Sequence, residues 1–119
     1  MEINNCVFED NPCYRFHFDQ DKSLLKITLD GYYDTELQKD VGKECTLVIK
    51  KWSKAKGKQL GDERLDDIEC HLGIVDIIRW LSLSQKNNCS VLEMEVITYD
   101  NRFVYWYFEN PIVELIVEF

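Results

Sequence analysis

A sharp turn at Asp100-Asn101 constrains the fold of this chain more than any other sequence feature. It separates two runs rich in β-branched and aromatic residues, 90–99 and 102–108. Two such runs around a two-residue turn predict an antiparallel β-hairpin, and a turn of that length also fixes which residues face each other. The expected facing pairs are Tyr99 with Arg102, Ile97 with Val104, Glu95 with Trp106, and Glu93 with Phe108.

The two sides of this hairpin have different characters. The side expected to be core is apolar or aromatic throughout and consists of Leu92, Met94, Val96, Phe103, Tyr105 and Tyr107. The other side carries Ile97, Val104, Trp106 and Phe108 beside Glu93, Glu95 and Arg102. A patch so rich in aromatic residues is rare on the surface of a monomer. Either a second layer covers it, or it is an interface with an aromatic centre and an acidic rim.

Alternating apolar and polar residues extend the β pattern along the rest of the chain. They predict strands at 14–19, 24–33, 44–52 and 112–119, and 74–84 is interpreted as a strand in preference to a helix. Leu65, Ile68 and Leu72 have helical spacing before Gly73, which predicts one short helix. We therefore expect a single domain over residues 1–119 with a mainly β fold. It would be an antiparallel sheet or sandwich of about six to seven strands with one short helix, and α+β is the alternative.

The charge balance limits the classes of partner. The chain has 22 acidic and 14 basic side chains among 119 residues, a formal net charge of −8. Such a charge disfavours nucleic acid and anionic membranes as partners and favours basic proteins. No apolar run approaches the roughly 18 residues of a membrane-spanning helix. We expect neither a nucleic-acid partner nor a membrane partner.

The cysteines indicate a reducing compartment. There are five, an odd number, and none forms a C-x-x-C pair. The first residues are polar and lack the basic start of a secretory leader. We expect free thiols and a cytoplasmic protein, with Cys45 as a small core residue.

An acidic cluster follows the middle of the chain and consists of Asp62, Glu63, Asp66, Asp67 and Glu69. On a helix, Asp62, Asp66 and Glu69 would share a face, and a basic partner would relieve the repulsion between their charges. The alternative is a solvated acidic helix face. The lysines at 50–58 before the cluster, around Trp52, are interpreted as a mobile loop, with nucleic-acid binding as the less favoured alternative.

No arrangement of residues indicates catalysis or metal binding. The histidines are His17 and His71, and His71 directly follows Cys70, so the two side chains point apart. Phosphate-binding and nucleophile-elbow motifs are missing, and the Cys and His residues lack zinc spacing. We therefore predict no catalytic residues, no metal site and no cofactor.

A small acidic domain of hairpin strands, with an internal acidic segment and an aromatic strand that ends in Phe108-Glu109-Asn110-Pro111, resembles the immunity proteins of bacterial contact-dependent growth inhibition and related polymorphic toxin systems. The resemblance covers most of the chain in style and implies a cytoplasmic protein that binds one cognate toxin domain, frequently a nuclease, and blocks its active site. No residue role can be transferred, because the resemblance includes no specific motif.

The leading hypothesis is an immunity-type inhibitor that covers the active site of a basic RNase or DNase toxin with an acidic surface. The predicted partner-binding residues are Asp62, Glu63, Asp66, Asp67, Glu69, Glu93, Glu95 and Trp106. We expect a monomer or a weak homodimer. The alternatives are a small hydrolase that uses His17 and an adaptor domain that self-associates through the hairpin.

Overall fold

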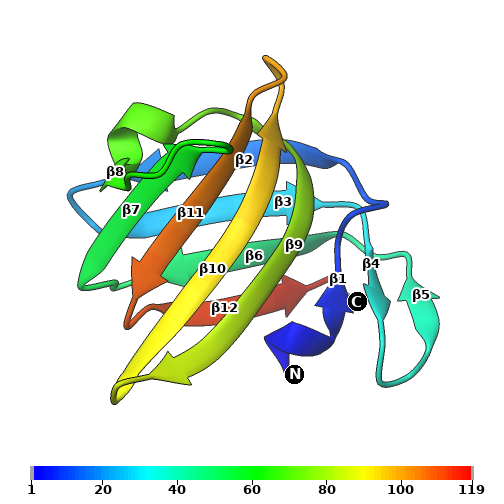
Figure 1. Ribbon diagram of the computed structural model, residues 1–119. Coiled ribbons are helices and arrows are strands. Elements are labelled where there is room, and N and C mark those ends of the chain that lie inside the picture. The colour runs from blue at the N-terminus through cyan, green and yellow to red at the C-terminus, as the bar shows by residue number, and fades with distance from the viewer. Residues whose placement is uncertain (1, 119) are drawn as a thin grey trace.

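The structure, a computed structural model, describes residues 2–118 and consists almost entirely of antiparallel strands (Figure 1). A five-stranded sheet with the order β8-β7-β11-β10-β9 lies in front in this view, and a four-stranded sheet with the order β12-β6-β3-β2 lies behind it. A third sheet, with the order β1-β4-β5, lies to one side. The mainly β fold expected from the sequence is confirmed.

The elements have the following bounds. The front sheet contains β7 (Lys54–Gln59), β8 (Asp66–Asp67), β9 (Val75–Lys86), β10 (Cys89–Thr98) and β11 (Phe103–Glu109). The back sheet contains β2 (Cys13–Asp19), β3 (Leu24–Leu29), β6 (Cys45–Lys50) and β12 (Ile112–Val117). The third sheet contains β1 (Cys6–Val7), β4 (Tyr32–Asp34) and β5 (Lys39–Val41). Two short 3-10 helices are η1 (Ile3–Asn5) and η2 (Ile68–His71).

The core fills the space between the two large sheets. Alternate residues of each strand point inward, because successive side chains of a strand lie on opposite faces. The fully buried residues of the back sheet include Leu25, Ile27, Leu29, Leu47 and Ile49. Those of the front sheet include Ile78, Leu92, Met94, Val96, Val104, Trp106 and Phe108. The rings of Phe16 and Trp106, 6.3 Å apart, join the two layers.

The segment 74–84 is a strand, as predicted. Residues 75–84 lie in β9, which connects to β10 through the two-residue turn Asn87-Asn88. Both asparagines have positive φ, as a type I′ turn requires. The free edge of β9 is capped at one point, because the Asn4 side chain bonds both the N–H and the C=O of Leu83 at 2.8 Å. An edge strand with satisfied backbone groups is protected from pairing with another chain.

The register predicted for the hairpin of β10 and β11 is wrong by one residue. The two strands pair Ile97 with Phe103 and Glu95 with Tyr105, so three residues connect them, not two. The Thr98 hydroxyl accepts a bond from the Arg102 N–H at 3.2 Å, and the backbone N–H of Thr98 donates to the Arg102 carbonyl at 3.0 Å. A type I turn followed by a residue with positive φ, here Asn101 at 63°, is the usual three-residue hairpin loop.

This shift exchanges the two sides of β11. Val104, Trp106 and Phe108 point into the core, and Phe103, Tyr105 and Tyr107 point outward. Trp106 is fully buried, so it is not available as the predicted surface anchor. The core side of β10, with Leu92, Met94 and Val96, is as predicted.

The acidic segment does not form the predicted helix. Asp66 pairs with Gly57 and Asp67 with Lys56, which makes the segment a short edge strand, β8, and η2 follows it. Ile68 is buried, and the Trp106 Nε1–H donates to the His71 carbonyl at 3.0 Å. These anchors hold the segment against the sheet, so Asp62, Asp66 and Glu69 do not share a helix face.

The lysine-rich stretch is also ordered in this structure. Lys54–Gln59 is strand β7, which pairs with β11 along six residues from Lys54↔Glu109 to Gln59↔Val104. The interpretation of this stretch as a mobile loop is therefore wrong. Gly57 faces inward, where a Cβ atom would lie 3.2 Å from both the Trp106 ring and the His71 side chain. The close packing over Gly57 explains a glycine in the middle of a strand.

Candidate functional site

The outer surface of the front sheet is the strongest candidate for a functional site. We call it the aromatic face, and it is made of Ile77, Trp80, Glu93, Glu95, Ile97, Phe103, Tyr105 and Tyr107. Figure 1 looks directly onto the sheet that carries it. Trp80 is 41% exposed and Phe103 is 42% exposed. Large exposed aromatic side chains that neighbour one another are typical of binding surfaces.

The strand register places these side chains in rows across the sheet. One row runs from Trp80 through Glu95 and Tyr105 to Lys58. The next runs from Ser82 through Glu93 and Tyr107 to Lys56. Each row therefore has an acidic group on β10, a tyrosine on β11 and a lysine on β7.

Glu95 fixes one aromatic side chain of the face. Its carboxylate accepts a bond from Trp80 Nε1 at 3.0 Å and lies 2.6 Å from the Arg79 guanidinium. Arg79 also lies over the ring of Phe103, at 5.7 Å from its centre. Since Glu95 has two donors within its own sheet, its charge is largely compensated. It orients Trp80 more than it offers a free negative charge.

Glu93 orients a tyrosine, Tyr105, in the same way. It accepts bonds from Tyr105 at 2.7 Å and from Lys86 at 2.8 Å. These bonds, first that of Lys86 and then that of Tyr105, hold the pKa of Glu93 below its ordinary value. Burial, followed by the bond to Glu93, raises the pKa of the Tyr105 phenol. Tyr105 therefore stays a neutral donor, and Lys58 lies over its ring at 5.6 Å.

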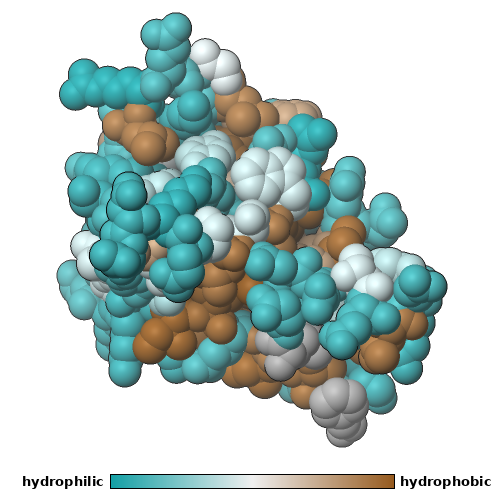
Figure 2. Space-filling model, turned by 60° about the horizontal axis from the view of Figure 1, so that its bottom comes forward, coloured by the Kyte–Doolittle hydropathy of each residue, from teal (hydrophilic) through white to brown (hydrophobic). Residues whose placement is uncertain are grey.

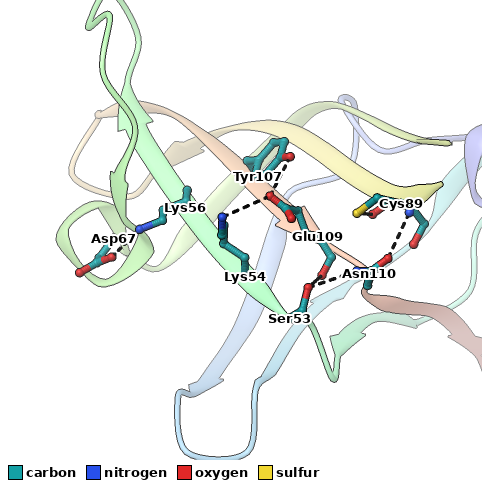
Figure 3. Close-up of polar contacts among 9 residues, drawn as sticks. Ser53, Lys54, Lys56, Asp67, Cys89, Tyr107, Glu109 and Asn110 are labelled. Atoms are coloured by element: carbon teal, nitrogen blue, oxygen red, sulfur yellow. Dashed lines mark hydrogen bonds and ion pairs between the residues drawn. The ribbon is translucent and has the colours of Figure 1, made fainter. Parts of the chain in front are cut away.

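At the lower edge of the aromatic face, a tyrosine and a lysine again contact one glutamate (Figure 3). Tyr107 donates to Glu109 at 3.0 Å, and Lys54 Nζ lies 3.8 Å from the same carboxylate. Lys56 on the neighbouring position of β7 reaches Asp67 of the acidic segment at 2.8 Å. Lys54 and Lys56 of β7 thus pair with Glu109 on one side and Asp67 on the other.

The acidic segment borders the aromatic face. The backbone N–H of Leu60 donates to the Phe103 carbonyl at 2.9 Å, and residues 61–71 then fold back along β7. We call residues 61–69 the acidic loop. Asp67 pairs with Lys56, and Asp66 lies 3.3 Å from His71 Nε2. Asp62, Glu63 and Glu69 are exposed, and none of them has an ion-pair partner within residues 2–118.

The structure places the predicted site residues on and around the front sheet. Glu93 and Glu95 lie on the aromatic face, and Asp67 lies at its β7 edge, paired with Lys56. Asp66 pairs with the inward-facing Gly57, so its side chain points to the other side of the sheet, toward His71. Trp106 does not belong to the site. Phe103 and Tyr105, which occupy it, were not predicted as surface groups, because the one-residue error in register assigned the wrong side of β11 to the core. Trp80, on β9, was not singled out by the sequence analysis.

The histidines lie apart and neither has a catalytic neighbour in the described part of the chain. His71 contacts Asp66, but no hydroxyl or thiol bonds its ring. His17 is exposed on the outer side of the back sheet, cross-strand to Lys26. Within residues 2–118, no group of three or more Cys, His, Asp or Glu side chains could hold a metal ion.

The thiols have no disulfide partners. Cys6, Cys13 and Cys45 are buried, and burial is the main cause that raises their pKa values to about 11, about 12 and about 11. The prediction that Cys45 is a core residue is confirmed. Cys70 is the exposed thiol and Cys89 is half-buried.

A second apolar surface occurs on the lower side of the molecule. Figure 2 brings this side forward and shows a band of hydrophobic atoms between polar regions. β12 and η1 lie on this side in Figure 1. Ile112 and Ile116 of β12 are exposed, but Glu114 and Glu118 alternate with them, so the apolar surface is interrupted by charge.

Comparison with known proteins adds no family to this description. No protein-family model matches the chain, and no curated protein or solved structure is significantly similar to it. Among the described residues, no helix has the length and apolar character needed to cross a membrane.

Proposed function

We propose that this protein binds a basic protein through the aromatic face and the adjoining acidic loop. The observation that supports the proposal most directly is the set of exposed and half-buried aromatic side chains held in place by half-buried glutamates. Trp80 is fixed by Glu95 and Tyr105 by Glu93, at 3.0 Å and 2.7 Å. Side chains that are already ordered lose little conformational entropy on binding, so they are suited to anchor a partner.

The acidic loop supplies the charge in this proposal. The glutamates of the face are paired within the sheet, whereas Asp62, Glu63 and Glu69 have no ion-pair partners among residues 2–118. Unpaired surface charge of one sign attracts a basic partner and raises the rate of association. The face would therefore provide contact area, and the loop would guide the encounter.

The finer proposal is that the partner is a toxin domain and that this protein is its immunity protein. The net charge of −8 and the position of the acidic loop beside the aromatic face support a basic partner. A basic nuclease domain, which must hold phosphates, fits that requirement. Covering its active site would block substrate, and the reducing compartment implied by free thiols fits a cytoplasmic inhibitor.

The test has three steps. The tagged protein captures partners from its native cells, the captured protein is identified and purified, and its affinity is measured by calorimetry. Expression of the partner alone should arrest growth, and co-expression of this chain should restore it. A partner without any effect on growth would remove the immunity proposal while leaving the binding proposal intact.

Variants then locate the surface. Trp80→Ala combined with Phe103→Ala should weaken binding by about 100-fold or more, because anchor residues dominate interfaces. Asp62→Asn combined with Glu63→Gln should slow association and reduce its dependence on salt. Tyr33→Ala is the matched control, since Tyr33 is an aromatic residue of similar exposure, 37%, on the third sheet. Equal affinity of the face variant and the control would rule out the aromatic face.

A further inference from the structure

The outer side of the back sheet contains a hollow that lies away from the aromatic face. Its volume is about 410 Å³, and its lining includes Arg15, His17, Lys26, Thr28, Thr46 and Val48. The front and back sheets are separated by the core, so this hollow and the aromatic face open on opposite sides of the molecule. The hollow therefore requires its own explanation.

The floor of the hollow lies below the level of its rim. Thr28 and Val48 point to the outer side of the sheet, yet each is only 4% exposed. The hydroxyls of Thr28 and Thr46, which face each other across β3 and β6, are 3.1 Å apart. Ile116 on β12 faces Thr46 and continues the apolar part of the lining. The lining thus combines the hydroxyls of Thr28 and Thr46 with the apolar side chains of Val48 and Ile116.

The rim of the hollow is cationic. His17 faces Lys26 directly across β2 and β3, and Arg15 faces Thr28 in the next row. Side chains that face each other in this way lie about 5 Å apart at their Cβ atoms, so His17 and Lys26 reach the same part of the rim. Within residues 2–118, no carboxylate forms an ion pair with Lys26. A concentration of positive charge is notable on a chain whose net charge is −8.

The nearest acidic side chains are already engaged. Glu44 bonds the Tyr14 hydroxyl, and its distance to the Arg15 guanidinium is 3.9 Å, at the outer limit of an ion pair. Glu114 lies 3.3 Å from Lys50. Lys26 therefore has no ion pair within residues 2–118, and Arg15 has only its long contact with Glu44. The two threonine hydroxyls bond each other, which leaves one of their hydrogens for an anion placed in the hollow.

We propose that this hollow binds a small organic anion, a phosphate or carboxylate group attached to an apolar body. The anionic group would contact Lys26 and Arg15, which are charge-assisted donors, and the threonine hydroxyls. The apolar body would lie against Val48 and Ile116. The volume falls within the roughly 300–1,000 Å³ of small-molecule sites, which favours a small ligand over a macromolecular partner.

Phenyl phosphate is the probe for this site, measured by calorimetry and by amide chemical shifts of the intact protein. We expect saturable binding, with shifts confined to β2, β3, β6 and β12. Inorganic phosphate should bind more weakly, because it lacks the apolar body, and phenol should bind more weakly still, because it lacks the charge. Binding of all three probes with equal affinity, or shifts spread over the whole surface, would overturn the proposal.

Two variants and a control separate the site from general charge effects. Lys26→Gln should weaken the binding of phenyl phosphate by about tenfold, the loss expected for one charge-assisted contact. Thr46→Val should weaken it by about threefold while keeping the side-chain shape. Lys22→Gln removes an exposed lysine of the same hairpin outside the lining and should leave affinity unchanged within twofold. An equal loss in Lys22→Gln and Lys26→Gln would refute the site, as would the lack of any saturable binding.

Discussion

Replacing Trp106 with phenylalanine tests the corrected register of the hairpin and the packing of the acidic loop together. The indole is fully buried, and its Nε1–H donates to the His71 carbonyl at 3.0 Å. Loss of this donor leaves a partly buried carbonyl unpaired, at a cost of about 1–2 kcal/mol. Loss of part of the ring system adds about 1–2 kcal/mol, less than the 3–5 kcal/mol of a full truncation to alanine. The free energy of unfolding should therefore fall by about 2–4 kcal/mol, and Tm by roughly 10 °C.

Trp80→Phe provides the matched control, because it is the same substitution on the outer side of the same sheet. Trp80 also donates to a carboxylate, but it is 41% exposed and Glu95 keeps its ion pair with Arg79. We expect a loss of about 0.5 kcal/mol, as for most surface substitutions. The assay is urea unfolding followed by far-UV circular dichroism, with equal m-values as the check that both variants unfold between the same states. A neutral Trp106→Phe, or a Trp80→Phe that costs as much, would mean that Trp106 is not the core residue of this pair.

Three further predictions concern the turn, the thiols and the pH dependence of stability. Asn88→Gly should stabilise the protein by a few tenths to about 1 kcal/mol in urea unfolding, because Asn88 has φ 63° and glycine adopts positive φ without strain. Iodoacetamide at pH 8 should alkylate Cys70 first and leave the buried thiols unmodified in the folded protein, as read by mass spectrometry. The folded pKa of Glu93 lies below its ordinary value of 4.5, so its contribution to stability is complete above that value and is lost as pH falls through the folded pKa. Glu93→Gln should therefore flatten the stability profile below about pH 4.5, and an unchanged slope would contradict the role assigned to its bonds with Lys86 and Tyr105.

The hairpin shows why the sequence predicts the fold more reliably than the site. Alternation identifies 90–99 and 102–108 as strands whatever the loop length, and both strands exist as β10 and β11. The two sides of β11 depend on the loop length, because a shift of one residue turns every side chain to the other face. Thr98 determines the loop length, because its backbone and its hydroxyl both bond Arg102 and leave three residues in the loop. The aromatic side chains on both sides of β11 gave no hydrophobic contrast that could have revealed the error.

The segment 54–69 shows the opposite case, in which tertiary contacts override local preference. Lysines and a glycine do not favour a strand, and neither do aspartate and glutamate. Here Gly57 allows close packing against Trp106, and the lysines of β7 pair with Glu109 and Asp67. The alternation of Lys54, Lys56 and Lys58 was a strand signal in the sequence. The carboxylates that pair with these lysines, Glu109 and Asp67, come from other strands, so local sequence alone does not identify them.

The distribution of paired and unpaired carboxylates separates two tasks on the proposed binding surface. Glu93 and Glu95 are compensated within the sheet, so their removal should loosen Tyr105 and Trp80 and increase the dissociation rate of a partner. Asp62 and Glu63 form no ion pair within residues 2–118, so their removal should act on the association rate. Salt screens the second effect more than the first, because exposed charges are screened over about 10 Å at 0.1 M, whereas hydrogen-bonded, half-buried groups are screened much less. A partner whose affinity loses its salt dependence in the loop variant but keeps it in the face variant would therefore use the two regions in different steps of binding.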